Sequence, residues 1–305
     1  MAFPTETVYG LGADASNAQA VARVFEVKGR PPGHPLIVHL PSAAALDEWA
    51  QSIPEAAQVL ARAFWPGPLT LLLDRRADRV PDEVTGGGES VGLRVPAHPL
   101  ALDLLAAFGG GIAAPSANRF GRVSPTTAAH VRSDLGGDVD LVLDGGACDV
   151  GVESTIIDFT NGAAEVVRSG GVTFEALERV LGRSVGVWLG DREVNAPGTL
   201  ATHYAPRASV VVVERAADVS RAAAAALREG STVVVLAPDA IDGLPRGAVQ
   251  LEPAGDDRSY AQVLYDRLRE ADRRRADLVL AVPPSDRDIG RAVRDRLHRA
   301  AAATE

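Results

Sequence analysis

The sequence predicts an α/β protein with two domains, each built around a sheet. Short apolar segments bounded by glycine or proline alternate with segments whose apolar residues recur at helical spacing. At 305 residues the chain is longer than one typical hydrophobic core requires, so two domains are expected. From Ser209 onward, strands and helices alternate regularly, which predicts a small parallel sheet covered on both sides.

The elements of the first domain follow from this pattern. Ser42 and Ser124 are predicted helix N-caps, and Pro125 would occupy the first helical position after Ser124. The Asn161-Gly162 pair predicts the turn of a β-hairpin between 154–159 and 164–168. The other expected strands are 2–4 (the end of a strand), 36–40, 69–73, 91–95, 112–114 and 141–143, and the expected helices are 17–27, 42–49, 54–64, 100–108, 126–135 and 174–181.

Residues 185–208 show little periodicity, and we expect them to form an interdomain linker. The predicted domains are therefore 1–184 and 209–305. In the second domain, strands are expected at 210–213, 232–236 and 278–281, and helices at 219–227, 260–273 and 289–302.

Composition excludes several classes of protein. A net charge of -9 argues against broad, sequence-independent binding of nucleic acid, which needs an electropositive surface, but it does not exclude a local basic pocket. The single cysteine, Cys148, excludes an internal disulfide and a multi-cysteine metal site. No apolar run is long enough to span a membrane, and the N-terminus shows no signal-peptide pattern. We therefore expect a cytoplasmic protein.

One cation is unusual. Lys28 is the only lysine in the chain, and it stands two residues before Arg30 and just ahead of a proline-rich loop. A compact ammonium and a planar guanidinium together suit a polyanion such as the phosphates of a nucleotide. The alternative is a surface lysine in an arginine-rich composition, and this stretch alone favours neither interpretation.

Polar side chains gather where the predicted strands of the first domain meet loops, and open α/β sheets bind ligands at such strand ends. Four cations in this set would meet a triphosphate, and Ser124 at a predicted helix N-terminus would add backbone donors. The set comprises Thr5, Thr7, Lys28, Arg30, His39, Arg94, Ser116, Asn118, Ser124, Ser154 and Arg168.

Some of these residues have structural alternatives. His39 lies in an apolar strand, so a hydrogen-bonded core histidine is the alternative to a ligand contact, and His34 would be a surface residue. Glu153 and Asp144 are candidate magnesium ligands, but two carboxylates nine positions apart do not define a site. The chain has no catalytic-triad spacing, no HExxH motif, and no GxGxxG or Walker A pattern.

Nine motifs, taken in order, resemble the YrdC/Sua5 family of L-threonylcarbamoyladenylate synthases in its two-domain form, over nearly the whole chain. The first six are Phe3-Pro-Thr-Glu-Thr-Val-Tyr-Gly-Leu-Gly12, Lys28-Gly-Arg30-Pro31, His34-Pro-Leu-Ile-Val-His39, Trp65-Pro-Gly-Pro-Leu-Thr70, Arg94-Val-Pro96 and Ala114-Pro-Ser-Ala-Asn118. The other three are Gly151-Val-Glu-Ser-Thr-Ile-Ile157, Arg168-Ser-Gly170 and His203-Tyr-Ala-Pro206.

The resemblance implies a YrdC-like twisted-sheet domain with a deep positive cleft and a smaller Rossmann-like Sua5 domain. It implies a nucleotidyltransferase that joins L-threonine, bicarbonate or CO2, and ATP into threonylcarbamoyl-AMP and releases pyrophosphate. The product would be handed to a tRNA threonylcarbamoyltransferase complex, which makes N6-threonylcarbamoyladenosine at position 37 of tRNAs reading ANN codons. Mg2+ is expected with ATP, its protein ligands being unassigned, and neither a membrane nor a stable nucleic-acid partner is expected.

The family's functional residues carry over onto three sets in this sequence. Threonine would be held by Thr7, His39, Arg94 (through its carboxylate), the backbone of Ala114, and Ser154. ATP would be held by Arg30, His34, Ser90, Ser116, Ser124, Arg168 and His203. A catalytic tetrad, stabilising charge on the α-phosphate while N-carboxythreonine attacks, would consist of Lys28, Arg30, Ser116 and Asn118.

The sequence departs from the family at three places. Relatives usually carry a helix and most of a strand before Phe3. In the linker, which would act as a lid, Thr199-Leu-Ala-Thr202 replaces a lysine and an aromatic residue, so direct nucleotide contacts there are expected from His203 and Tyr204 alone. His34 stands where asparagine is also common.

Three other functions are weighed against synthesis. An RNA-binding module without catalysis is the main alternative, and the net charge of -9 argues against it. The carbamoyl-transfer modules of hydrogenase maturation proteins are accompanied by zinc fingers, which a single cysteine excludes here. A non-catalytic regulatory protein is the third alternative.

Overall fold

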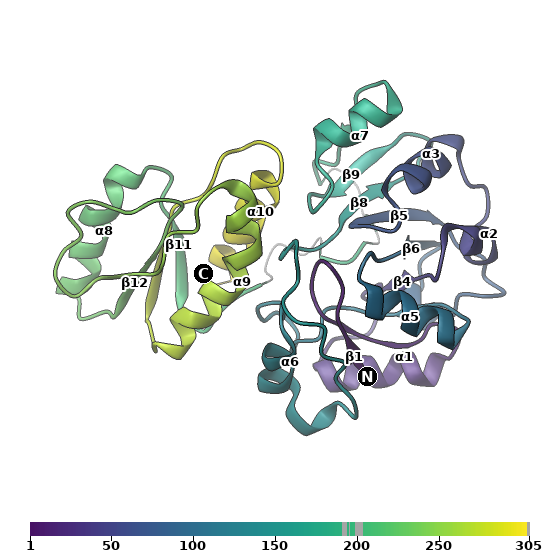
Figure 1. The fold of residues 1–305 in the computed structure, drawn as a ribbon, viewed down its shortest axis with the longest axis horizontal. Coiled ribbons are helices and arrows are strands. Elements are labelled where there is room, and N and C mark those ends of the chain that lie inside the picture. Colours follow the sequence, from purple (N-terminus) through teal and green to yellow (C-terminus); the bar gives the residue numbers. More distant parts are fainter. Residues whose placement is uncertain (191–193, 195, 199–203, 304–305) are drawn as a thin grey trace. The chain divides into compact units, whose positions relative to one another are not determined.

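The computed structural model describes residues 1–190, 194, 196–198 and 204–303. The chain divides into two compact units, one comprising Met1–Phe120 and Ser124–Thr199, the other Gly121–Val123 and Leu200–Glu305 (Figure 1). The predicted ATP contact His203 lies outside the described residues.

The first unit is built on an eight-stranded mixed sheet with the order β10-β9-β8-β5-β6-β4-β7-β3. A separate antiparallel pair is formed by β1 (Ala2–Phe3) and β2 (Gly10–Leu11). The strands of the large sheet are β3 (Ala13–Asp14), β4 (Ile37–His39), β5 (Leu69–Asp74), β6 (Ser90–Arg94), β7 (Ile112–Ala113), β8 (Thr155–Asp158), β9 (Glu165–Arg168) and β10 (Gly186–Val187).

Alternation along the central strands gives the two faces of this sheet different roles. Val38, Leu71 and Leu93 belong to the main hydrophobic core. Ile37 and Leu72, the neighbours of these residues along the chain, belong to a separate small apolar cluster and therefore face the other side. The main core is completed by side chains from α1 (Ala18–Lys28), α2 (Leu46–Trp49), α3 (Glu55–Phe64), α4 (Asp82–Thr85) and α7 (Phe174–Leu181).

Helix α1 carries Lys28 at its last position. Asn17 caps its start, because the Asn17 side chain accepts hydrogen bonds from the backbone N–H groups of Gln19 and Ala20. Gly29 ends it with φ of +62°, a left-handed conformation that costs glycine little. The backbone therefore turns sharply between Lys28 and Arg30.

Several expectations about local structure are wrong. Ser42 makes no side-chain cap, and the helix expected after it is a short 3-10 turn (Ala43–Ala45) followed by the four residues of α2. Helix α6 (Ala128–Leu135) is capped by Thr127 rather than Ser124, whose hydroxyl donates to Glu153 instead. Residues 141–143 form a single bridge to Ala2 in place of a strand. Helix α5 (Pro99–Phe108) begins one residue earlier than expected.

The second unit contains the small parallel sheet that the sequence predicts, with the order β11-β14-β12-β13 and every pairing parallel. Its strands are β11 (Ser209–Val212), β12 (Val233–Leu236), β13 (Val249–Gln250) and β14 (Leu278–Ala281). Figure 1 shows α8 (Ala216–Arg228) on one side of this sheet, and α9 (Asp257–Arg273) and α10 (Gly290–Ala302) on the other. Within the described residues, no helix is both long and apolar enough to cross a membrane.

Replacing the Asn17 cap tests the account of α1. Asn17→Ala is expected to lower the free energy of unfolding by about 1 kcal/mol, because two backbone donors lose their acceptor. The matched variant Ser42→Ala is expected to change it by less than about 0.5 kcal/mol, since Ser42 caps nothing. Urea unfolding followed by tryptophan fluorescence measures both, because Trp49, Trp65 and Trp188 all lie in the first unit. If Asn17→Ala lowered the free energy of unfolding no more than Ser42→Ala does, the Asn17 cap would be contradicted.

Candidate functional site

The candidate site is a strip along β4 and β6 on the face of the large sheet opposite the main core. These two strands are parallel, and their register sets Ile37 beside Gly92 and His39 beside Arg94. Val38 and Leu93 between them belong to the main core, so His39 and Arg94 both project from the opposite face. The carboxyl ends of two neighbouring strands thus present an imidazole and a guanidinium side by side.

Arg94 is almost fully buried and is held at every nitrogen. Its Nη1 donates to Thr7 Oγ1 at 3.0 Å, and its Nε donates to the carbonyl of Gly67 at 3.3 Å. Its Nη2 lies 2.7 Å from Glu6 Oε1, in an ion pair whose angle is not that of a linear hydrogen bond. The predicted threonine contacts Thr7, His39 and Arg94 therefore come together at one end of the strip.

His39 is buried and uncharged at neutral pH. Burial, followed by the positive charge of Arg94, lowers the pKa of His39 from 6.5 to about 3. The ring packs edge-on against Phe3, with centroids 5.8 Å apart. Its Nδ1 has no hydrogen-bond partner among the described residues, so a buried polar atom remains able to bond a ligand.

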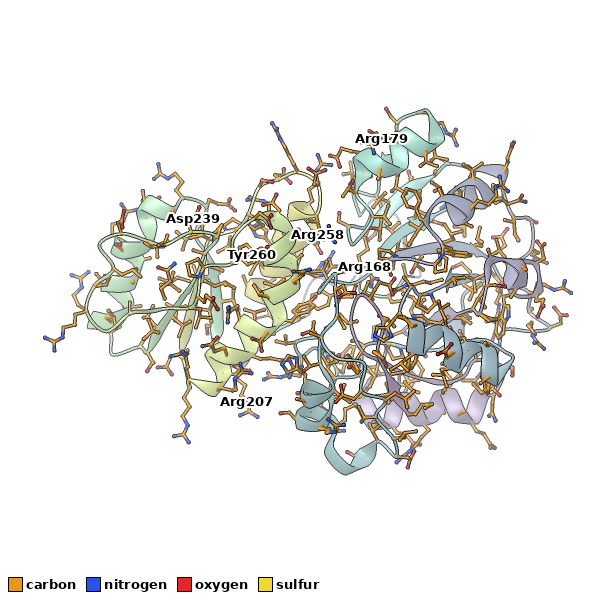
Figure 2. All side chains as sticks on the ribbon, in the orientation of Figure 1. Arg168, Arg179, Arg207, Asp239, Arg258 and Tyr260 are labelled. Carbon is orange, nitrogen blue, oxygen red and sulfur yellow. The ribbon has the colours of Figure 1, made fainter. Side chains whose placement is uncertain are left out.

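Ser154 and Arg168 extend this end of the strip across β5, to the start of β8 and the end of β9. Arg168 ends β9 and donates through Nε and Nη2 to the Ser154 carbonyl, at 3.1 and 2.9 Å (Arg168 is labelled in Figure 2). Arg168 Nη2 also donates to Ser154 Oγ at 3.0 Å, and Ser154 Oγ lies 2.8 Å from Thr70 Oγ1. The predicted ATP contact Arg168 is thus adjacent to the predicted threonine contact Ser154.

Lys28 is buried and joined to the predicted partners Ser116 and Asn118 through their backbones. Its Nζ donates to the carbonyl oxygens of both residues at 2.5 Å. Burial, followed by the nearby charge of Arg30, lowers the pKa of Lys28 well below its usual value. The charged form of Lys28 therefore stands to be stabilised by an added negative charge.

Arg30, His34 and Ser90 gather at the amino ends of β4 and β6. Arg30 Nη2 donates to the carbonyl of Pro35, just before β4, and the guanidinium lies 5.7 Å from the ring centre of Phe120. The ring of His34 also packs on Phe120, at 5.5 Å, and burial together with Arg30 lowers the pKa of His34. Ser90 begins β6, so about 13 Å of strand separates it from Arg94.

Ala114 lies beside β4, and Ser124 lies beside Glu153. Ala114 N donates to the carbonyl of Ile37 at 2.9 Å, which continues the pairing beyond β7. Ser124 is fully buried and donates to Glu153 Oε1 at 2.7 Å, next to Ser154. Ser124 therefore does not lie at a helix N-terminus, as the sequence predicted, and its hydroxyl is bonded to a carboxylate.

Sequence reasoning missed two residues of this site. Glu6 pairs with Arg94, and Thr70 contacts Ser154. A signal existed for both, since Glu6 stands between the two threonines of the Phe3–Gly12 motif and Thr70 is a hydroxyl within an apolar strand. The described residues contain no group of three or more histidine, cysteine, aspartate or glutamate side chains able to hold a metal ion.

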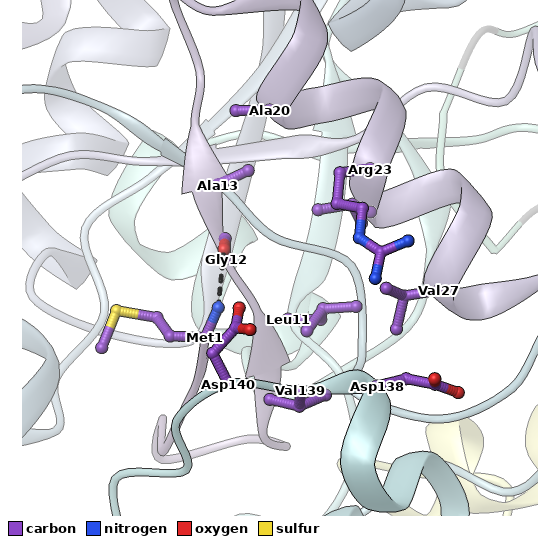
Figure 3. Close-up of a pocket in the computed structure, with 11 residues that line it drawn as sticks. Met1, Leu11, Gly12, Ala13, Ala20, Arg23, Val27, Asp138, Val139 and Asp140 are labelled. Carbon is purple, nitrogen blue, oxygen red and sulfur yellow. Dashed lines mark hydrogen bonds between the residues drawn. The ribbon is translucent and has the colours of Figure 1, made fainter.

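A separate cavity of about 200 Å³ lies against the start of the chain and α1 (Figure 3). The N-terminal ammonium of Met1 donates to the carbonyl of Gly12 there at 3.4 Å. None of the predicted site residues lines it; the lining residues are Met1, Leu11, Gly12, Ala13, Ala20, Arg23, Val24, Val27, Asp138, Val139 and Asp140.

The pKa of His39 predicts how stability depends on pH. Between pH 6.5 and about 3 the unfolded chain binds a proton at His39 that the folded chain does not, so stability falls as the pH is lowered. Each pH unit in this window lowers the free energy of unfolding by up to about 1.4 kcal/mol through His39. Urea unfolding of wild type and His39→Gln from pH 7 to 4 should show a shallower fall for the variant. Parallel curves would contradict a neutral, buried His39.

Comparison with known proteins places the chain in a family. Residues 1–170 match the Sua5, YciO and YrdC family, described as telomere recombination, and residues 172–302 match the C-terminal domain of threonylcarbamoyl-AMP synthase. The chain is 42% identical to threonylcarbamoyl-AMP synthase of Pyrococcus abyssi, covering 98% of this chain and 89% of that protein. It is 40% identical to the enzyme of the same name from Bacillus subtilis, covering 99% and 89%.

A solved structure agrees with these matches. The crystal structure of P. abyssi Sua5 complexed with L-threonine superposes with a TM-score of 0.92 at 41% identity, covering 99% of this chain and 90% of that one. The two-domain α/β fold and the ordered motifs predicted from the sequence agree with this likeness. The chain belongs to the Sua5/YrdC family of threonylcarbamoyl-AMP synthases.

Proposed function

We propose that this chain makes threonylcarbamoyl-AMP along the strip on β4 and β6, with threonine at the carboxyl ends of these strands and the nucleotide extending toward their amino ends. One observation carries the proposal. The register of β4 and β6 sets His39 beside Arg94 on the face away from the main core, and Lys28 is buried against Ser116 and Asn118 in the same unit.

Threonine is proposed to bind through its carboxylate to Arg94. A guanidinium matches a carboxylate in shape and charge, and Thr7 and Gly67 already orient it. The unpaired Nδ1 of neutral His39 and the hydroxyl of Ser154 would meet the polar groups of the amino acid. The crystallised P. abyssi Sua5 is a complex with L-threonine, which supports an amino-acid subsite in this fold.

The phosphates of ATP are proposed to meet Lys28, Arg30 and Arg168. Buried cations stabilise developing negative charge strongly, because little water screens them. The lowered pKa of Lys28 means that its charged form is costly in the free protein and gains from an added phosphate. The ring of Phe120, on which His34 packs, would suit the remainder of the nucleotide.

The chemistry then requires positioning more than a protein nucleophile. The threonine amine attacks CO2 and releases a proton, or attacks bicarbonate and releases water, to give N-carboxythreonine. An oxygen of the new carbamate group then attacks the α-phosphorus. The bond to the bridging oxygen breaks and pyrophosphate leaves with its electron pair. Lys28 and Arg30, with Ser116 and Asn118, would hold the α-phosphate and stabilise the added charge.

Magnesium is proposed to enter as part of the substrate MgATP. Because the described residues hold no cluster of metal-binding side chains, phosphate oxygens and water would supply most of its ligands. Glu153 is the carboxylate adjacent to Ser154, and it already accepts a hydrogen bond from Ser124.

Residues 185–208 are proposed to act as a linker, and its first part is proposed to cover the strip. Trp188, Val194 and Ala196 pack against Ile37 and the other members of the small apolar cluster. Pro197 accepts a hydrogen bond from Arg168 Nη1 at 3.0 Å. The first part of this segment therefore lies on the face where ATP is proposed to bind.

We further propose that the protein works in the cytoplasm and passes its product to a tRNA threonylcarbamoyltransferase complex.

Loss of the single lysine tests the proposal. Lys28→Ala is expected to lower kcat for pyrophosphate release by at least about 100-fold, because one buried cation at the α-phosphate is removed. Release is measured from ATP with and without L-threonine and bicarbonate, and threonine binding by calorimetry is expected to persist. Arg23→Ala, on the exposed side of the same helix, is the matched control and should keep wild-type turnover. Near-normal turnover of Lys28→Ala would contradict the assignment.

A further inference from the structure

We propose that Glu6 is a positioning residue of the amino-acid subsite, fixing the orientation of the Arg94 guanidinium so that its remaining N–H groups can bind the substrate. The inference rests on the proposed role of Arg94 in binding the carboxylate of threonine. Glu6 does not touch substrate in this proposal; it acts through Arg94.

Glu6 and its neighbour Thr7 hold opposite ends of one guanidinium. Thr7 Oγ1 accepts from Nη1 at 3.0 Å, and Glu6 Oε1 lies 2.7 Å from Nη2. The turn that presents them is fixed by Thr5, whose hydroxyl accepts from the N–H groups of Thr7 and Val8 and donates to the carbonyl of Val8. Two consecutive side chains on a rigid turn therefore set the plane of the guanidinium.

The second oxygen of Glu6 ties this turn to the backbone beyond β6. Glu6 Oε2 accepts from the N–H of Ala97 at 3.0 Å, three residues past Arg94. Gly67 closes the same region, since its N–H donates to Val95 and its carbonyl accepts from Arg94 Nε. One carboxylate thus fixes both the side chain of Arg94 and the chain that follows it.

The ion pair between Glu6 and Arg94 is buried. Neither Glu6 Oε1 nor Arg94 Nη2 is accessible, whereas Nη1 faces the hydroxyl of Thr7. Removing the charge of Glu6 has two opposite effects on a bound carboxylate: it relieves a repulsion and it frees Arg94 to rotate. Because Glu6 and Thr7 together fix the plane of the guanidinium, we expect loss of orientation to dominate.

Steady-state kinetics of Glu6→Gln in the full-length protein tests this inference. Gln keeps the size of the side chain and loses its charge, so KM for threonine is expected to rise about tenfold, while KM for ATP stays within about twofold. Asp158→Asn is the matched control, because Asp158 is an equally buried carboxylate that caps a turn at Thr160. Asp158→Asn is expected to lose stability without changing KM for threonine.

A second variant separates failure of this inference from failure of the assignment on which it rests. Arg94→Lys keeps a positive charge but loses the planar fork, so it should also raise KM for threonine. If Arg94→Lys raises that KM and Glu6→Gln leaves it unchanged or lowers it, the role of Glu6 is overturned and that of Arg94 stands. If neither variant changes it, the assignment of Arg94 fails and the inference about Glu6 fails with it.

Discussion

The candidate site depends on the parallel pairing of β4 with β6. This register brings His39 and Arg94 together and turns both away from the main core, while Val38 and Leu93 point into it. A slip of one residue in either strand would move its polar side chain into the core and an apolar side chain onto the strip. The register is therefore strongly specified. Gly92 leaves the middle of the strip without a side chain. A Cβ there would lie 3.2 Å from Thr70 Cγ2. Packing and site geometry are therefore set by the same alternation.

Electrostatics divides the buried cations of the first unit into two kinds. Arg94 is neutralised by Glu6, and it keeps a fixed orientation. Lys28 rests on two neutral carbonyls and lies near Arg30, so its charge is less well compensated. A cation paired with a carboxylate, such as Arg94, suits selective binding of an amino acid. A cation bonded only to neutral groups, such as Lys28, is stabilised most when a phosphate binds or accumulates negative charge. This difference fits the roles proposed for the two residues, Arg94 in binding the threonine carboxylate and Lys28 in stabilising charge on the α-phosphate.

Much of the fold could be predicted from the sequence because periodicity reports burial directly. Helix α7 and strand β14 begin and end where the pattern predicts, and the hairpin of β8 and β9 follows its Asn-Gly signal. Cap residues were less predictable, since a serine hydroxyl bonds either a local N–H or a distant partner. Ser124 bonds Glu153, 29 positions away, and Ser42 bonds no helix N–H. The bridge of Val142 to Ala2 likewise depends on a pairing that local sequence does not encode.

The types of residue in the site were predictable from its motifs, but their contacts were not. Lys28 meets Ser116 and Asn118 through backbone carbonyls, which no side-chain pattern reveals. The role of Glu6 appears only when the turn at Thr5 and the end of β6 are brought together in the fold. Motifs show which atoms are available, and the sheet register determines which of them meet.

A crystal structure with L-threonine and a non-hydrolysable ATP analogue tests the central claim most directly. We expect the threonine carboxylate within hydrogen-bond distance of Arg94 and the α-phosphate in contact with Lys28. Both ligands should lie on the face that carries His39. Threonine bound away from Arg94, or phosphates that leave Lys28 uncontacted, would contradict it.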